Sequence, residues 1–307
     1  MAKQPKAIFG NHPFTPDGKK DEPIFLDSSN IGYFVYPDEG LDYSDLNNVF
    51  FSGEHLTVCT MDIGPGGFFN PPDYHPGDEA YFIAEGVDSQ YCPATGQMVQ
   101  VGKDEALLIP KGVLHSAYNF ETERLRAIAV IAPKIVEDQT FPTDTDTPKK
   151  LLQGAHNAEL PRIGEYDDPQ LIGSVDNLGA WPAPGPVLRE KGVLYHVTEQ
   201  KKLKTVHGDL HPILVKFSIS NDFMQMGEYI VPVGGTTCRH SDEIVHPSEC
   251  VLVGLDGITT VYLPETHGAY QIHRYEGLYL PRNTRYQLIN YEAERARCLF
   301  AVEGGKF

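Results

Sequence analysis

The chain has 307 residues, of which 41 % are hydrophobic and 22 % are charged, and this composition is typical of a globular protein with a packed core. Its formal net charge of −17 argues against binding to nucleic acid or to anionic membranes, because both need clustered positive charge. Neither a secretory signal nor an apolar run of about 18 residues is visible, so we expect a cytoplasmic protein without transmembrane helices.

Taken in chain order, the first predicted unit is an irregular N-terminal arm over residues 1–50. A β-rich unit is expected at residues 51–135, because apolar residues alternate from His55 to Ile63 and short apolar runs follow, each ended by Gly or Pro. These runs are EAYFIAEG, EALLIP and RLRAIAVIAP. Their length and spacing predict the strands of a sandwich or barrel of the jelly-roll kind.

Residues 136–190 are rich in Pro, Thr and Asp and predict a linker, in which LLQGAHNAEL has the pattern of one short helix. A second β-rich unit is expected at residues 191–307. Its predicted strands are ILVKFSI, EYIVPV, CVLVGLDG, ITTVYL, YQIHRY and RCLFAVEG. We therefore expect an all-β chain with two domains and a long connection between them.

The two β-rich units repeat each other. NFETERLRAIAVIA, which begins at Asn119, shares an aromatic residue, two glutamates and two arginines with NYEAERARCLFAVE, which begins at Asn290. The same offset of 171 residues places Pro110 on Pro281. Because one offset holds over several strands, the chain consists of two copies of one module.

The stretch PPDYHPGDEAYFIAEG in the first copy contains the candidate ligands of a metal site. Side chains two apart on a strand share a face, so Asp73 is expected beside His75, and Glu79 beside Tyr81. His115 follows the turn after a later strand. Two imidazoles and one carboxylate that converge on one side form the ligand set favoured by non-haem Fe(II).

The spacing of these residues resembles two motifs of the cupin superfamily. The residues at the places of the first motif, Gly, His-x-His, Glu and Gly, are Gly67, Asp73, His75, Glu79 and Gly86. The residues at the places of the second motif, Pro-x-Gly, His and Asn, are Pro110, Gly112, His115 and Asn119. Only Asp73 departs from the pattern, because it replaces the first histidine.

This resemblance implies a bicupin, which is an all-β protein of two tandem cupin jelly-roll barrels. It also implies one divalent metal per chain, held in the first barrel by His75, Glu79 and His115. Fe(II) is favoured, with Mn, Zn or Ni as alternatives. Asp73 stands where the family usually has a ligand, so it is expected to be a fourth ligand or a group beside the metal, such as a general base.

The second copy does not keep this ligand set. The residues that the offset places on the four candidate ligands are Ile244, His246, Cys250 and Tyr286. We expect a metal-free second barrel with a structural role, either covering the first barrel or pairing subunits. The protein is therefore expected to form a homodimer or a higher homo-oligomer.

The predicted site indicates an enzyme that acts on a small molecule. Phe69, Tyr81 and Tyr118 are expected to line an aromatic pocket, which suits a planar phenol or diketone. The favoured reaction is C–C cleavage by an Fe(II) dioxygenase, with Asp73 and Tyr81 as catalytic groups. One alternative is an O2-independent lyase, decarboxylase or isomerase that uses Mn, Zn or Ni on a sugar acid or keto acid. The other is a non-catalytic bicupin that binds sugar or serves as a storage protein.

Overall fold

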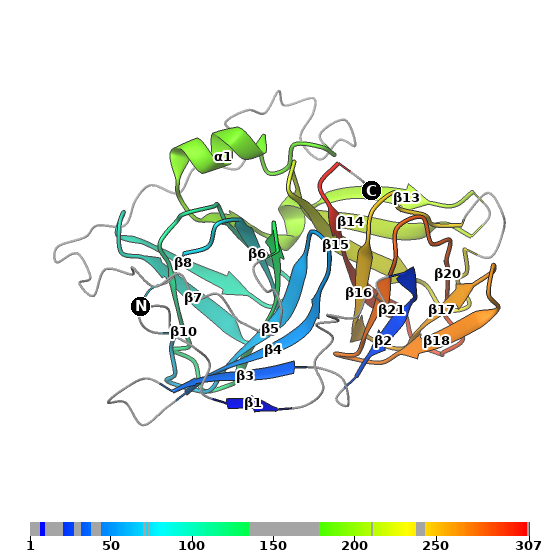
Figure 1. The fold of residues 1–307 in the computed structure, drawn as a ribbon, viewed down its shortest axis with the longest axis horizontal. Helices are drawn as coiled ribbons and strands as arrows, with labels where there is room; N and C mark the ends of the chain where they lie inside the picture. The colour runs from blue at the N-terminus through cyan, green and yellow to red at the C-terminus, as the bar shows by residue number, and fades with distance from the viewer. Residues whose placement is uncertain are drawn as a thin grey trace.

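The structure is a computed structural model. It describes residues 7–9, 21–27, 32–37, 44–69, 72, 74–134, 178–209, 211–237, 243–305 and 307. These residues form two β-barrels that lie side by side (Figure 1). The all-β fold expected from the sequence is confirmed. In the described parts of the chain, no helix has both the length and the apolar character needed to cross a membrane.

The N-terminal barrel contains two antiparallel sheets. Its strands are β1 (Ala7–Phe9), β3 (Gly32–Pro37), β4 (Ser44–Ser52), β5 (Thr57–Ile63), β6 (Asp78–Glu85), β7 (Val87–Cys92), β8 (Gln97–Gly102), β9 (Ala106–Ile109), β10 (Ser116–Tyr118), β11 (Leu125–Ala132) and β12 (Tyr195–Val197). The larger sheet has the order β1-β3-β4-β5-β11-β6-β9-β12, and the smaller one has the order β10-β7-β8.

The C-terminal barrel repeats this arrangement. Its strands are β2 (Ile24–Leu26), β13 (Leu203–His207), β14 (Ile213–Ser220), β15 (Met224–Val231), β16 (Cys250–Asp256), β17 (Thr259–Leu263), β18 (Gly268–Ile272), β19 (Gly277–Leu280), β20 (Gln287–Ile289) and β21 (Ala296–Glu303). The larger sheet has the order β13-β14-β15-β21-β16-β19-β2, and the smaller one has the order β18-β17-β20.

The N-terminal arm and the linker contain secondary structure that the sequence did not predict. Residues 1–50, expected to be irregular, contain β1, β2, β3 and most of β4, because they supply strands to both large sheets. The short helix expected at LLQGAHNAEL lies outside the described residues. A helix, α1 (Gly185–Lys191), is found later in the predicted linker, where Gly192 ends it in a left-handed conformation with φ of 60°. A 3-10 turn, η3 (Glu199–Lys201), follows β12.

Each barrel completes its large sheet with a strand that precedes the other barrel. β2 pairs with β19 of the C-terminal barrel, where Ile24 lies opposite Tyr279. β12 pairs with β9 of the N-terminal barrel, where Tyr195 lies opposite Leu108. Ile24 and Tyr195 are separated by the repeat offset of 171 residues, so the two exchanges are equivalent. Backbone pairing therefore interlocks the barrels in both directions.

Alternation along the strands separates the barrel interiors from the surface between the barrels. On β6, Tyr81 packs in the interior of the N-terminal barrel, whereas Phe82 belongs to a hydrophobic cluster that both barrels share. In that shared cluster Phe51 stacks on Tyr279, with 3.9 Å between the ring centroids. Burying one such side chain contributes about 1.5–3 kcal/mol, so this apolar contact stabilises the two-barrel unit.

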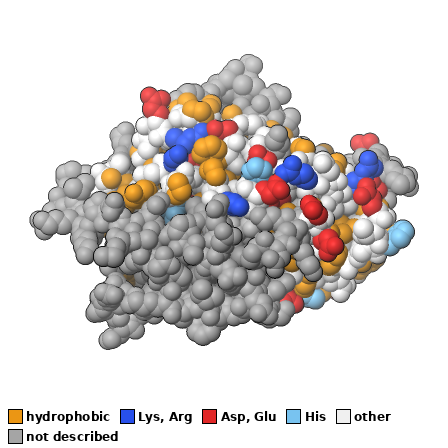
Figure 2. Space-filling view, in the orientation of Figure 1, with side chains coloured by type: hydrophobic (Ala, Val, Ile, Leu, Met, Phe, Trp, Pro, Cys, Tyr) orange, Lys and Arg blue, Asp and Glu red, His pale blue; other side chains and the backbone are white. Residues whose placement is uncertain are grey.

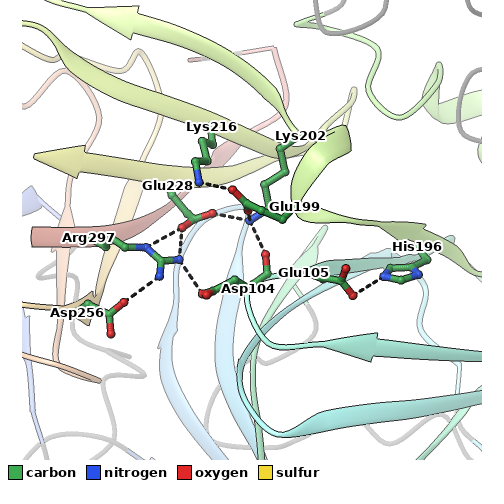
Figure 3. Close-up of polar contacts among 9 residues, drawn as sticks. All are labelled: Asp104, Glu105, His196, Glu199, Lys202, Lys216, Glu228, Asp256 and Arg297. Atoms are coloured by element: carbon green, nitrogen blue, oxygen red, sulfur yellow. Dashed lines mark hydrogen bonds and ion pairs between the residues drawn. The ribbon is translucent and has the colours of Figure 1, made fainter. Parts of the chain in front are cut away.

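A buried ionic network also joins the barrels (Figure 3). Arg297 of β21 binds Glu228 of β15 at 2.5 Å and reaches Asp104, between β8 and β9, at 2.7 Å. Lys202 binds the other carboxylate oxygen of Glu228 at 2.5 Å and the backbone oxygen of Asp104 at 2.7 Å. The side chains of Glu228 and Lys202 are fully buried, so their charges depend on each other for stabilisation.

The described surface carries charges of both signs. On the face shown in Figure 2, basic side chains lie among acidic ones and do not form a continuous stripe. The absence of a nucleic-acid partner, expected from the net charge of −17, stays a prediction. Homo-oligomer formation, a cytoplasmic location and the domain boundaries proposed above stay predictions.

Candidate metal centre

The three predicted ligands come from three places in the N-terminal barrel. Glu79 is the second residue of β6, where it lies between Ile131 of β11 and Ile109 of β9. His75 lies in the segment before β6, and His115 directly precedes β10. A central strand, held on both sides by backbone hydrogen bonds, therefore positions the carboxylate, while two connections between strands position the imidazoles.

The structure brings these three side chains together. The Nε2 atoms of His75 and His115 lie 3.2 and 3.1 Å from the same oxygen, Oε2 of Glu79. One ligand atom from each residue lies within 4.8 Å of the other two, and all three residues are buried. In the described chain, this is the one cluster of at least three His, Cys, Asp or Glu side chains at such distances.

The donor atoms fit a divalent metal. Oε2 of Glu79 is buried and makes no hydrogen bond of good geometry to a described residue, although the Nε2 atoms of His75 and His115 lie 3.2 and 3.1 Å from it. Burial raises the pKa of Glu79, but the charge of His75 and the contacts with both histidines outweigh burial and hold this pKa well below its ordinary value. Glu79 is therefore an ionised carboxylate, and this is the form that ligates a divalent cation.

The backbone determines which nitrogen of His115 faces the centre. Nδ1 of His115 lies 2.9 Å from the carbonyl oxygen of Val113, which can only accept a hydrogen bond. Nδ1 therefore carries the proton in the neutral imidazole, and Nε2 presents its lone pair beside Glu79. A bond from the second nitrogen to a carbonyl is a common way to orient a histidine that ligates a metal.

Two of the predicted aromatic pocket residues lie by the interior of this barrel. Tyr81 is 5 % exposed, and burial, followed by the charge of Glu79, raises the pKa of its hydroxyl well above the ordinary value. The Tyr81 hydroxyl therefore stays protonated and has one O–H to donate, in the neighbourhood of the Glu79 carboxylate. Phe69 is partly buried and packs against the apolar residues of the same interior.

The structure does not bring Tyr118 to the three ligands. Its neighbour on β10, Ala117, packs in the barrel interior, so strand alternation turns Tyr118 outward. The ring of Tyr118 stacks between Phe68 and the exposed Phe120, with centroid distances of 5.7 and 5.5 Å. We therefore no longer place Tyr118 in the pocket. Asp73, the fourth candidate ligand, lies outside the described residues.

Two interior polar residues are missed by the sequence analysis. Asp88 and Gln90 of β7 lie opposite Val101 and Val99 of β8, which pack in the barrel interior. With its amide oriented to donate, the Gln90 nitrogen lies 3.1 Å from both carboxylate oxygens of Asp88. Burial, followed by the charge of Glu79, raises the pKa of Asp88 well above its ordinary value. Asp88 and Gln90 are two residues apart, and on a barrel strand this spacing places both side chains on the same face, so the sequence could have indicated them.

The equivalent place in the C-terminal barrel holds a network of hydrogen-bonded side chains. Nε2 of His246 lies 2.9 Å from the hydroxyl of Tyr286 and 3.3 Å from that of Tyr229. The two tyrosine hydroxyls lie 3.2 Å apart. Cys250, in place of the carboxylate, is buried, and burial raises the pKa of its thiol, so it remains protonated. These side chains therefore hydrogen-bond to one another at the place that holds the candidate ligands in the first barrel.

Comparison with known proteins supports the resemblance seen in the sequence. Residues 59–131 match the Cupin domain family, which covers the strands that surround the candidate metal centre. No curated protein matches the chain in sequence. The resemblance to cupins is therefore confirmed for residues 59–131. Solved structures also share the fold of most of the chain.

Three solved structures illustrate this likeness of fold. AerE from Microcystis aeruginosa is 10 % identical, with a TM-score of 0.54 and coverage of 91 % of this chain and 98 % of AerE. Oxalate decarboxylase from Lactobacillus farciminis, solved as a formate complex, is 12 % identical, with a TM-score of 0.57 and coverage of 92 % and 86 %. Oxalate decarboxylase from Bacillus subtilis, studied for its Mn(II) centres, is 11 % identical, with a TM-score of 0.56 and coverage of 94 % and 80 %.

Proposed function

We propose that the N-terminal barrel binds one divalent transition metal through His75, Glu79 and His115, and that the protein is a metal-dependent enzyme acting on a small oxygen-bearing substrate. The observation that carries this proposal is the buried Oε2 of Glu79, which makes no hydrogen bond of good geometry to a described residue and lies 3.2 and 3.1 Å from the two Nε2 atoms. When bound, the ion supplies a Lewis acid with open positions for substrate.

The other interior residues would bind and orient the substrate. The hydroxyl of Tyr81 stays protonated beside Glu79, and its one O–H would turn from Glu79 to an oxygen atom of a bound molecule. Burial and the charge of Glu79 raise the pKa of Asp88, which favours its protonated form, and in that form it can donate a proton. Asp73 remains our candidate for a fourth ligand or a general base. The apolar side chains that pack with Tyr81 would exclude water from the interior.

The ligand set favours an Fe(II) dioxygenase as the first candidate. Two histidines and one carboxylate on a buried site, with open positions, are the arrangement found in non-haem Fe(II) oxygenases. A phenolic or diketone-like substrate would present adjacent oxygen atoms to the ion and a planar face to Phe69 at the edge of the interior.

The solved structures favour a second candidate, an O2-independent decarboxylase or related lyase that uses Mn(II). Two of the three solved structures described above are oxalate decarboxylases, and the one from Bacillus subtilis has Mn(II) centres. A neutral interior acid such as Asp88 suits this reaction, because decarboxylation leaves a carbanion that must be protonated.

Oxygen dependence separates the two candidates. Protein loaded separately with Fe(II) and with Mn(II) should be assayed against catechols, hydroquinones, diketones and small keto or dicarboxylic acids, with and without O2. We expect turnover with one of the two metals and none without metal. Oxygen uptake matched to product would select the dioxygenase, and CO2 release under anaerobic conditions would select the decarboxylase. Turnover that is unaffected by metal removal would contradict both.

A further inference from the structure

The turn at residues 110–113 connects the two histidine ligands. Its Gly112 has a left-handed backbone, with φ of 77°, and donates its N–H to the backbone oxygen of His75 at 3.0 Å. The carbonyl oxygen of Val113 accepts the bond from Nδ1 of His115 at 2.9 Å. The N–H of Val113 donates to the oxygen of Pro110 at 3.0 Å and closes the turn. A shift of this turn would therefore move both imidazoles.

Asp78 ties this turn to the strand that carries the third ligand. Its Oδ1 accepts the backbone N–H of Lys111 at 2.8 Å, and its side chain is fully buried. Asp78 directly precedes Glu79, and alternation points the two carboxylates to opposite faces of β6. One carboxylate outside the barrel interior thus links the connections that hold all three ligands.

The second oxygen of Asp78 is held by residues that follow the N-terminal barrel. Arg189 of α1 donates from Nη1 to Oδ2 of Asp78 at 2.8 Å, and Asn221 donates from Nδ2 to the same oxygen at 3.1 Å. Asn221 belongs to the turn between β14 and β15 of the C-terminal barrel, where its Oδ1 accepts the N–H groups of Phe223 and Met224 at 2.9 and 3.0 Å. The C-terminal barrel therefore holds Asp78 through a rigid turn.

The repeat shows which part of this arrangement is specific to the metal-binding half. Glu249, at the position of Asp78, accepts N–H groups of Glu54, His55 and Leu56 at 2.8, 2.8 and 2.9 Å, so it also joins the two barrels. The turn of the C-terminal barrel is intact as well, because Asn283 donates its N–H to the oxygen of His246 at 2.7 Å. Among the described residues, however, the Glu249 side chain makes no hydrogen bond to that turn.

We propose that Asn221 and Arg189 are positioning residues for the metal centre, and that they act through Asp78 on the turn at residues 110–113. This inference rests on the proposed function. It assigns the C-terminal barrel a part in metal binding although that barrel supplies no ligand. It also explains why an interface carboxylate contacts the ligand-bearing turn in the N-terminal half and not in the other.

The test is Asn221→Asp. This change keeps the oxygen that accepts from Phe223 and Met224, but it places a carboxylate oxygen where the N–H group bonded Asp78. We expect the Kd for Mn²⁺, measured by calorimetric titration of the metal-free full chain, to rise about 10- to 100-fold, as for other residues that orient metal ligands. We also expect faster amide hydrogen exchange in the peptide containing residues 110–115 of the metal-free protein.

Glu249→Gln is the matched control, because it weakens the equivalent contact of the other barrel and leaves Asp78 unchanged. Its Kd for Mn²⁺ should stay within about twofold of wild type. A Kd within twofold for Asn221→Asp, with unchanged exchange at residues 110–115, would overturn the inference. Equal losses in both variants would also overturn it, since general loosening of the interface would explain them. If the wild-type chain binds neither Mn²⁺ nor Fe²⁺, the proposed function fails, and unaltered exchange in Asn221→Asp would then reject the positioning role independently.

Discussion

His115→Ala protein is expected to bind Fe²⁺ or Mn²⁺ at least about 100-fold more weakly than the wild-type chain. Residues that only orient a metal ligand already change affinity by 10- to 100-fold, so loss of a ligand should cost no less. His115 supplies one of three donor atoms that lie within 4.8 Å of one another, and no other described His, Cys, Asp or Glu joins that cluster. Calorimetric titration of metal-free protein would measure the change.

Tyr286→Phe is the matched control for this result. Tyr286 occupies the position of His115 in the second copy, and its hydroxyl bonds His246 at 2.9 Å. Removing that hydroxyl should leave the metal affinity unchanged and lower the stability by about 1–3 kcal/mol, because His246 and Tyr229 are buried and both lose this partner. If Tyr286→Phe lost metal and His115→Ala kept it, the metal would have to lie in the C-terminal barrel.

Glu228→Ala is expected to lower the free energy of unfolding by about 3–5 kcal/mol, the usual cost of removing one partner from a buried ion pair. Glu228 is fully buried and binds Arg297 and Lys202, each at 2.5 Å. Among the described residues, the ionic partner left to the buried ammonium of Lys202 would then be Glu199 at 3.0 Å, together with the backbone oxygen of Asp104. Chemical denaturation followed by circular dichroism would measure the loss.

Glu85→Ala provides the comparison for burial. Glu85 also binds two arginines, at 2.7 and 3.3 Å, but its side chain is 25 % exposed and both arginines are more exposed still. Exposed ion pairs contribute about 0–1 kcal/mol, so this variant should be destabilised much less than Glu228→Ala. Similar losses in the two variants would show that burial of the network does not determine its contribution.

The main features of the fold could be predicted because they are local or repeated. The offset of 171 residues and the short apolar runs identify two copies of one β module. The exchange of β2 and β12 between the barrels could not be predicted. Each of these strands has three residues. β12 pairs with β9, more than eighty residues earlier, and β2 pairs with β19 of the other copy, so no local pattern identifies either pairing.

The candidate site was predictable to a similar degree. His75, Glu79 and His115 stand at motif spacings, and their convergence follows from the barrel that the motifs imply. Tyr118 was misplaced because the sequence does not show which side chains of β10 face the barrel interior. In the structure Ala117 faces inward, so Tyr118 faces outward. The contact between Asp78 and Asn221 spans 143 residues and depends on how the barrels dock, which residue spacing does not reveal.

The central claim is that the N-terminal barrel holds one divalent metal through these three residues. Elemental analysis of wild-type protein, purified without oxygen or added metal and compared with Glu79→Gln prepared in parallel, tests it most directly. We predict about one iron or manganese per wild-type chain and almost none in Glu79→Gln, because the amide replaces the ionised carboxylate beside both imidazoles. Equal metal in the two proteins, or none in wild type even after incubation with Fe²⁺ and Mn²⁺, would contradict the account.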